Sequence, residues 1–478
     1  MGVIRTSILS DADLRGVHEG ALQVLRRTGV RVHHDKVLAR LREVGAEVDL
    51  QQQRARLPED LVMRSVAQAG KSYVLHGRDP GRTARFGFGD LNQMSSPGQQ
   101  AWVDGETGEL RRPTLEDTRA GIRLGDALPN ITIVGALAQP AEVPPGFGDV
   151  LLASELVKGS TKPTRGWVHN ARSARYVLDI YRAVAGGSDA LRQSPMTETF
   201  LEPVSPLQMP HDGLEAVMEY VRAGQPLSIN PMSMVSGTAP GTLAGALVLE
   251  HAEILAGVVI VQTLGPGTPV LYGGIPHIMD PRTSLCSFGS PEQGLMAVAM
   301  AQLGRSLGFP VYVNAGLTDA KTLDAQAGIE KSSSLILGVL AGADLVGHAG
   351  ICGADQGASL EWLVLDDELM SFAKRVARGL EVSPETLATE VIESVGPGGN
   401  FLAEEHTVRH FRRQLWIPGA AWERQAWSGW SEAGRRSMTD RVRERSRGLL
   451  AKHQAPLLEP ALATEIDRMV ACARQEWI

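Results

Sequence analysis

The sequence is poor in residue types that mark particular classes of protein. It contains 3 cysteines among 478 residues, at positions 286, 352 and 472. So few and so widely spaced, they cannot build the disulfide framework of a small secreted protein, and they fit a reducing compartment. Lysine occurs 8 times against 39 arginines, and the formal net charge is −7. Because no basic field covers the chain, we expect no nucleic-acid partner.

Long hydrophobic runs of the kind that membrane proteins need are also missing. The N-terminal segment MGVIRTSILSDADL has no apolar core of about 7–15 residues, as a signal peptide would. The most apolar stretch, 243–264, carries Glu250, His251 and Glu253, which a bilayer-spanning helix rarely tolerates. We therefore expect a buried helix there, no membrane association and a cytoplasmic location.

Glycine and tryptophan are the residues in surplus. There are 52 glycines, a larger share than the roughly 7% of an average protein. Aromatic residues make up only 5% of the chain, yet the 8 tryptophans nearly equal the 9 phenylalanines, and four of them lie at 416, 422, 427 and 430. We interpret this cluster as a cap that packs C-terminal helices on the body of the protein. An interface with another molecule and a wall of the substrate site are the alternatives.

The pattern of apolar residues divides the chain into three parts. Residues 1–85 are predicted to be an N-terminal helical region, whose first helix begins at Ser10 with Asp13 as its capping-box partner. From about residue 86, short apolar runs alternate with helical segments, as in repeated βαβ units with a parallel sheet. The expected strands are 131–137, 163–169, 197–201, 227–230, 269–272, 311–314 and 344–346. The expected helices are 147–158, 171–185, 211–223, 240–262, 291–307, 324–341 and 359–378.

This alternation predicts an α/β fold, specifically a (β/α)₈ TIM barrel over residues 86–400 with helical N-terminal and C-terminal extensions. The eighth strand is placed near 95–103 or 399–402, and residues 401–478 form the C-terminal helical extension. A doubly wound open sheet is the alternative. No glycine-rich phosphate loop follows a strand, which argues against it.

In such a barrel the active site gathers at the carboxyl ends of the strands and in the loops that follow them. Polar and aromatic residues stand at these positions, and further ones lie in the loops 314–331 and 346–369, the second of which is rich in glycine. We predict as catalytic residues His348, Asp319 and Glu202. We predict as substrate-binding residues Trp167, His169, Asn230, Tyr272, His277, Asn314, Gln326 and Trp362.

Metal chemistry and Schiff-base chemistry are the two alternatives for this sequence. His348 and Cys352 have no third ligand at zinc spacing, and His33 and His34 diverge at a helix start, so we expect no metal site. Lys162 and Lys321 lie near strand ends, where one of them could form a Schiff base in another TIM-barrel lyase or hydrolase.

The sequence resembles the trimethylamine methyltransferase family, which are corrinoid-dependent enzymes with a TIM-barrel fold. The resemblance covers nearly the whole chain, and the ordered combination of segments makes it specific. It is carried by the segments VLRRTGVRV, GAEVD, DAKTLDAQAGIEK, AGADLVGHAG, SLEWLVLDDEL, HTVRHFRRQLWIP and AWSGW.

The resemblance implies that a methylated amine gives a methyl group to the Co(I) corrinoid (cobalamin) of a separate partner protein. Members that use trimethylamine carry pyrrolysine, whereas this sequence has only the twenty standard residues. The expected donor is therefore a quaternary amine such as glycine betaine, as in relatives without pyrrolysine. We also expect a homo-oligomer, and we keep a catalytically silent betaine-binding protein as an alternative.

A quaternary amine suits the predicted site residues. Its departure leaves a neutral tertiary amine, so no general acid is needed, and the enzyme must mainly orient the N–CH₃ bond and exclude water. A trimethylammonium group favours aromatic faces, for which Trp167, Tyr272 and Trp362 are candidates. A betaine carboxylate would pair with donors such as His348 or Asn230.

Overall fold

The N-terminal part is a mixed α/β layer and not the helical region expected from the sequence. The computed structural model describes residues 5–477. The three expected helices are confirmed as α1 (Asp11–Arg27), α2 (Asp35–Glu43) and α3 (Glu59–Gln68), and Ser10 and Asp13 form the capping box of α1. Between them, β1 (Val30–Val32), β2 (Glu47–Asp49) and β3 (Arg54–Arg56) form a sheet with β10 (Gln208–Met209), in the order β10-β1-β3-β2. β1 pairs with residues 208–209, so local periodicity could not reveal it.

Parallel strands form the centre of the molecule. β9 (Thr199–Leu201), β11 (Leu227–Ile229) and β13 (Val270–Tyr272) make one sheet, and β16 (Tyr312–Asn314), β17 (Leu345–Ala349) and β6 (Asn92–Ser95) make another. A bridge between Tyr272 and Val311 joins the two sheets. Further bridges continue the series from Met94 to Ile133 and from Val134 to Thr164. Within residues 5–477, no backbone pairing joins Thr164 to β9, so the ring of strands is open there.

Two of the expected strands are thus reduced to isolated bridges. In 131–137 the chain leaves the extended region at Leu137, whose φ is 63°. In 163–169 the first residue is Pro163, which has no N–H to donate to a ladder. The strand expected near 95–103 or 399–402 is found as β6, which overlaps the first range only at Ser95, and residues 399–402 form no strand.

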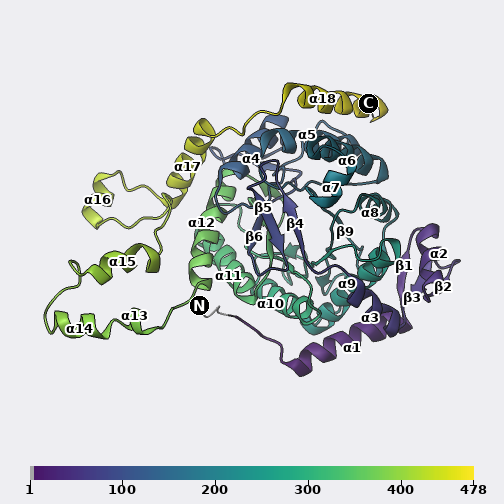
Figure 1. Ribbon diagram of the computed structural model, residues 1–478, viewed down its shortest axis with the longest axis horizontal. Helices are drawn as coiled ribbons and strands as arrows, with labels where there is room; N and C mark the ends of the chain where they lie inside the picture. Colours follow the sequence, from purple (N-terminus) through teal and green to yellow (C-terminus); the bar gives the residue numbers. More distant parts are fainter. Residues whose placement is uncertain (1–4, 478) are drawn as a thin grey trace.

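Helices surround these strands (Figure 1). The expected helices are confirmed as α5 (Pro145–Gly159), α6 (Ala171–Ala185), α8 (His211–Ala223), α9 (Leu243–Leu264), α10 (Pro291–Ser306), α11 (Ala325–Ala341) and α12 (Leu360–Ala377). α4 (Leu115–Ala127) and α7 (Ser188–Gln193) were not foreseen. α9 is the single described helix that is long and apolar enough to cross a membrane, and 83% of its apolar window is buried inside the protein. It is a core helix, as expected.

Short strands line the loops between the main elements. β4 (Tyr73–His76) pairs with β5 (Thr83–Phe86). β12 (Met234–Val235), β14 (His277–Met279) and β15 (Cys286–Ser287) form a three-stranded sheet in the loops that follow β11 and β13. β18 (Ile351–Cys352) and β19 (Gly357–Ala358) come directly after β17, and they form a sheet with β7 (Trp102–Val103) and β8 (Leu110–Arg111). The loops after the strands therefore have a fixed shape.

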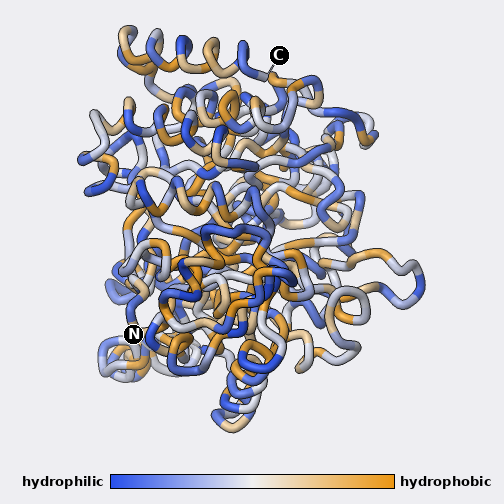
Figure 2. The backbone as a smooth tube through the Cα atoms, turned by 90° about the vertical axis from the view of Figure 1, so that its right-hand side faces the viewer, coloured by the Kyte–Doolittle hydropathy of each residue, from blue (hydrophilic) through white to orange (hydrophobic). Residues whose placement is uncertain are grey.

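The C-terminal part first leaves the body and then returns to it. α13 (Pro384–Leu387), α14 (Thr389–Val395), α15 (Glu405–Gln414) and α16 (Trp427–Glu432) project to one side in Figure 1 and contain no buried residue. α17 (Met438–Lys452) packs on α12 and α4, and α18 (Pro460–Trp477) packs on α5 and α6. In Figure 2, α18 runs along one side of the body with apolar and polar residues alternating around it.

The tryptophan cluster is divided between the body and the projecting part. Trp416 lies edge-on to Phe372 of α12 at 5.3 Å, and Trp422 is stacked on the same ring at 5.7 Å. These two residues pack the C-terminal part against α12, which agrees with the interpretation of the cluster as a cap on the body of the protein. Trp427, which contacts Trp430 at 5.1 Å, is 79% exposed and caps nothing within the described chain.

Candidate active site

A buried ion pair lies at the base of the candidate site. Arg165 and Glu198 face each other at 2.9 Å, with side chains 1% and 0% exposed. The Tyr73 hydroxyl donates to Glu198 at 2.7 Å, and the Asn230 amide oxygen accepts from Arg165 at 3.2 Å. Such a pair is costly to bury and is held only by good geometry and further hydrogen bonds. Arg165 is therefore a fixed positive charge beneath the site.

Two carboxylates lie near this charge and keep access to solvent. Side chains alternate along a strand, so Glu198, Phe200 and Glu202 point to the same side of the β9 segment. Burial raises the pKa of Glu202 to about 7, and the Asp355 carboxylate adds to the rise, whereas Arg165 opposes it. Burial likewise raises the pKa of Asp355 to about 6, against a 2.7 Å hydrogen bond from Gln99.

Glu202 and Asp355 belong to one cluster of side chains that still reaches solvent, and we call this cluster the pit. Asp355 is exposed and Glu202 is partly exposed, yet protein surrounds both densely enough to raise their pKa. Asp355 sits in the left-handed backbone region with φ of 67°, a conformation that non-glycine residues adopt mainly at functional sites and turns. Glu202 makes no side-chain hydrogen bond to any described residue, so one negative group of the pit is free for a ligand.

Aromatic side chains form one wall of the pit. The Trp167 indole N–H donates to the Gly98 carbonyl at 3.1 Å, and its ring meets Phe200 edge-on at 4.9 Å. The His169 ring lies 6.4 Å from Trp167. Its Nδ1 donates to Asp149 at 2.6 Å, and this bond raises the pKa of His169 against the effect of burial. These contacts orient the Trp167 ring within the pit.

Neutral polar groups also belong to the pit. The His348 ring lies 5.9 Å from Tyr312, and burial, assisted by Arg165, lowers the pKa of His348 to about 3. His348 is therefore uncharged near neutral pH. The Tyr312 hydroxyl and the Asn314 side-chain oxygen are buried without a partner among the described residues. Unpaired buried polar atoms are uncommon, and here they are available to a bound ligand.

The structure brings together about half of the residues that the sequence singled out. Those around the pit are Trp167, His169, Glu202, Asn230, Asn314 and His348. Six more residues of the pit were missed, namely Gln99, Arg165, Glu198, Phe200, Tyr312 and Asp355. Arg165 and Glu198 lie inside predicted strands, and Asp355 lies in the glycine-rich loop. The sequence therefore pointed to the right segments but not to these residues.

Tyr272 and Trp362 do not belong to the pit, and their predicted role is corrected. Tyr272 is fully buried on the outer side of β13, where its hydroxyl bonds to His251 of α9 at 2.8 Å. A fully buried strand gives no sequence signal for which face points inward. Trp362 is 2% exposed and packs under the Lys331 ammonium at 5.3 Å, inside the core.

Asp319, Gln326 and His277 lie in the segments that follow the central strands. Asp319 is in a loop, Gln326 is on the first turn of α11, and His277 begins β14. Asp319 accepts from the backbone N–H groups of Phe288 and Gly289 at 2.8 and 3.1 Å and from the Ser287 hydroxyl, so it fastens a loop. Gln326 is exposed on α11 and donates to Glu330 at 2.7 Å. His277 bonds to the Ile275 carbonyl at 2.9 Å and packs against Phe288 at 5.1 Å. These positions correct the predicted catalytic role of Asp319 and the predicted substrate contact of Gln326.

The lysines of the alternative chemistry also lie away from the pit. The Lys162 ammonium is buried and donates to the carbonyls of Gly125 and Leu128 at 2.9 and 2.6 Å, and burial lowers its pKa to about 8. Lys321 is exposed and donates to the Asp319 carbonyl at 2.7 Å. Neither ammonium has a contact with a residue of the pit within the described part of the chain.

The sequence as a whole matches the pattern of one family, described as trimethylamine methyltransferase (MTTB), over residues 2–477. The chain belongs to the trimethylamine methyltransferase family. It is 31% identical to the glycine betaine methyltransferase of Desulfitobacterium hafniense over 468 residues, which are 97% of this chain and 96% of that protein. It is also 31% identical to a trimethylamine methyltransferase MttB of that species, over 98% and 94% of the two chains.

Solved structures support the fold of this family member. The monomethylamine methyltransferase (MtmB) of Methanosarcina barkeri superposes with a TM-score of 0.51 at 14% identity, covering 96% of each chain. At that identity the likeness concerns the fold alone. The family membership, together with the parallel strands and surrounding helices, makes this protein a mixed α/β methyltransferase.

Proposed function

We propose that the protein transfers a methyl group from a quaternary amine, glycine betaine or a similar betaine, to the Co(I) corrinoid of a separate partner protein. The family membership supports a methylamine or betaine methyltransferase. The observation that carries the substrate class is the pair of solvent-reached carboxylates, Glu202 and Asp355, beside the fixed ring of Trp167. A permanent cation is the ligand that such a pit binds best, because carboxylates and an aromatic face both attract it.

We further infer that the ring of strands is a (β/α)₈ barrel whose backbone ladder is interrupted at one seam. The eight chain segments follow one another in parallel, and the Arg165–Glu198 ion pair spans the seam between Thr164 and β9. The pit then lies at the carboxyl ends of the strands, where the active sites of such barrels are found.

The reaction needs little from acid–base groups. The bond between nitrogen and the methyl carbon breaks with its electron pair left on nitrogen, so a neutral tertiary amine departs without a proton. The corrinoid supplies the nucleophile that forms the new bond to the methyl carbon. Glu202 and Asp355 stabilise the cation when it binds, and Trp167 holds the ammonium head in one orientation. The uncharged His348 and the unpaired Tyr312 hydroxyl are left to donate hydrogen bonds to the carboxylate of the substrate.

The pit also fits an acceptor that is delivered from outside. His169 and Asp355 are exposed and Glu202 is partly exposed, so solvent reaches the pit. A corrinoid on a carrier protein must approach through such an opening, because this chain supplies only the amine side of the site.

The test is to mix the purified protein with Co(I) corrinoid and single candidate donors, and to follow the absorbance change on formation of methyl-Co(III). Glycine betaine, carnitine, proline betaine, choline and trimethylamine are the donors to compare. We expect methylation with at least one betaine and a loss of rate in Glu202→Gln. No methylation with any quaternary amine would contradict the proposal, and tight betaine binding without methylation would support a silent binding protein.

A further inference from the structure

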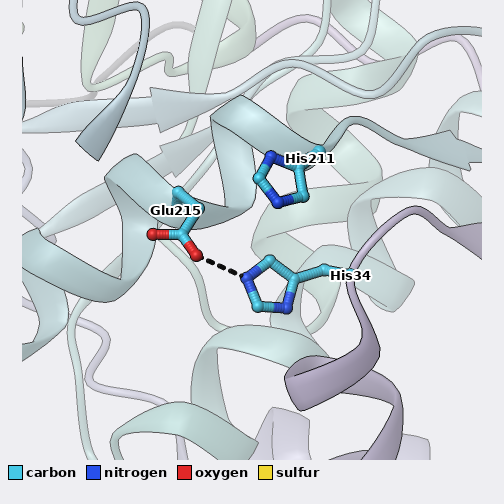
Figure 3. A group of neighbouring side chains, drawn as sticks. All are labelled: His34, His211 and Glu215. Carbon is cyan, nitrogen blue, oxygen red and sulfur yellow. Dashed lines mark hydrogen bonds and ion pairs between the residues drawn. The ribbon is translucent and has the colours of Figure 1, made fainter. Parts of the chain in front are cut away.

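Three metal-binding side chains meet where the N-terminal sheet joins α8 (Figure 3). His34 is the N-cap residue of α2, whereas His211 and Glu215 lie on the first two turns of α8. Residues four positions apart share a helix face, so His211 and Glu215 point in the same direction. One nitrogen or oxygen atom from each of the three side chains lies within 4.8 Å of the others.

We propose that His34, His211 and Glu215 bind a first-row divalent cation, with Zn²⁺ as the preferred ion. Two imidazole nitrogens and a carboxylate oxygen are a ligand set that zinc accepts, and the fourth position remains for water. His211 is 58% exposed in its side chain, so the ion can enter from solvent. This site is separate from the pit and does not depend on the methyl-transfer proposal.

The neighbours of His211 favour metal binding. Its Nδ1 donates to the Asp212 carboxylate at 2.9 Å. A proton fixed on Nδ1 leaves the lone pair on Nε2, which faces the cluster, and a carboxylate behind a histidine is the usual support of a metal ligand. The Glu215 carboxylate already accepts a hydrogen bond from His34 Nε2 at 2.8 Å, so one of its oxygens lies at the cluster.

Without an ion, His34 is held as a hydrogen-bonding side chain. Its Nε2 donates to Glu215 at 2.8 Å, and its Nδ1 accepts from the Val37 N–H at 3.3 Å. Its ring is stacked on His211 with centroids 5.1 Å apart and an angle of 13°. Binding through Nε2 moves the ring proton to Nδ1 and gives up the long bond from Val37. The tautomer of His34 therefore reports on occupancy.

The ion would connect two distant parts of the chain. His34 follows β1, and His211 follows β10, the strand with which β1 pairs at Arg31–Gln208 and Val32–Met209. A bound ion would fasten this junction and stabilise the folded state, which alone brings the ligands together. Sequence spacing could not show the site, because its ligands lie in segments that only the fold brings together.

The experiment is a zinc titration of untagged full-length protein by calorimetry, with metal content measured after dialysis. A second imidazole pair, His406 and His410 on α15, stacks at 4.3 Å and competes for the same ion. All measurements are therefore made in a His406→Ala/His410→Ala background. We expect one zinc per chain, a raised melting temperature with zinc, and a shift of the His34 proton from Nε2 to Nδ1 in ¹⁵N NMR spectra.

Two variants and one matched control decide the assignment. His211→Ala removes a ligand while leaving the His34–Glu215 bond intact, so it should fold normally and lose the bound zinc and the thermal shift. Asp212→Asn should weaken binding about 10-fold. His33→Ala is the control, because His33 lies next to the site but bonds to Gln53 and Gln208. The proposal is overturned if zinc does not bind in a 1:1 ratio, or if His211→Ala binds it as the parent does.

Discussion

Glu202 and Asp355 retain protons at a pH where ordinary exposed carboxyl groups have lost theirs. Their pKa values of about 7 and 6 arise chiefly because the surrounding protein displaces water, although both groups still reach solvent. Perturbed carboxyl groups in a pit are typical of functional sites. At the scale of single residues, the pit is therefore a receptor for positive charge whose strength depends on pH.

Substrate binding should become tighter as the pH rises through 6 to 8. Below its pKa of about 7, Glu202 is protonated and attracts a cation weakly, and above it the carboxylate is anionic. We expect glycine betaine to bind about 10-fold more tightly at pH 8 than at pH 6, with release of protons on binding. Calorimetry in buffers of different ionisation enthalpy measures both effects. Glu202→Gln should abolish most of the pH dependence, whereas the exposed Glu390→Gln should leave it unchanged.

Trp167 should contribute through its aromatic face. Trp167→Ala is expected to lower kcat/KM by about 5-fold to 30-fold, since cation–π contacts in partly desolvated sites are worth about 1–2 kcal/mol. Trp167→Phe should lose less, because it keeps a ring. Trp427→Ala, on the projecting part and 79% exposed, is the matched control. Equal activity of Trp167→Ala and Trp427→Ala would show that no cation binds against this ring.

At the scale of helices and strands, the seam between Thr164 and β9 is the distinctive element. Backbone pairing is absent there among residues 5–477, and the buried Arg165–Glu198 pair spans the gap. The ion pair thus joins the two strands, and Glu198 offsets the Arg165 charge beneath the pit. Its removal should affect stability before it affects chemistry.

Glu198→Gln should reduce the free energy of unfolding by about 3–5 kcal/mol, because it leaves the Arg165 charge buried without its partner. The double variant Arg165→Met/Glu198→Leu should lose less stability than Arg165→Met and Glu198→Leu lose in total when each is made alone. Chemical denaturation followed by circular dichroism provides the measurement. Glu43→Gln, in a pair with Arg40 that is more than 60% exposed on both sides, should cost less than about 0.5 kcal/mol. Additive losses at 165 and 198 would contradict the coupling.

The sequence predicted elements better than it predicted side-chain directions. Helices such as α6 and α11 were correct because capping residues and apolar spacing are local signals. The strand expected at 95–103 is found earlier in the chain, as β6, and 163–169 forms only a bridge. The pairing of both segments depends on residues distant in the sequence. In the site, Glu202 was singled out because it follows the end of β9, and Trp167 because it stands near the end of the expected strand 163–169. Tyr272 was misplaced, since a strand buried on both faces shows no alternation from which its inward side could be read.

At the scale of the whole molecule, the segment from α13 to α16 leaves the body and exposes apolar side chains. Leu402, Val408 and Ile417 are 85%, 72% and 66% exposed. Large exposed apolar patches commonly mark interaction surfaces. The exposed Trp427 belongs to this part of the chain, in contrast to Trp416 and Trp422, which cap α12.

The protein should be a homo-oligomer at micromolar concentration. Sedimentation velocity would measure its mass, with 51.2 kDa expected for a single chain. Leu402→Ser/Val408→Ser should shift the distribution towards the single chain if these side chains are part of the contact, whereas Leu110→Ser on β8, also exposed, should not. A parent protein that sediments as a single chain would refute the expectation.

The pairing of β6 with β17 also sets the order in which the protein can be completed during synthesis. Asn92 pairs with Leu345, so one of the first strands of the ring to leave the ribosome has a partner among the last. Contacts between such distant residues are slow to form. The Asp355 side of the pit comes after both, and β1 must wait for β10 in the same way. A nascent chain that stops short of residue 345 therefore has apolar strand edges without partners, and the growing protein depends on protection from aggregation until most of its length has been made.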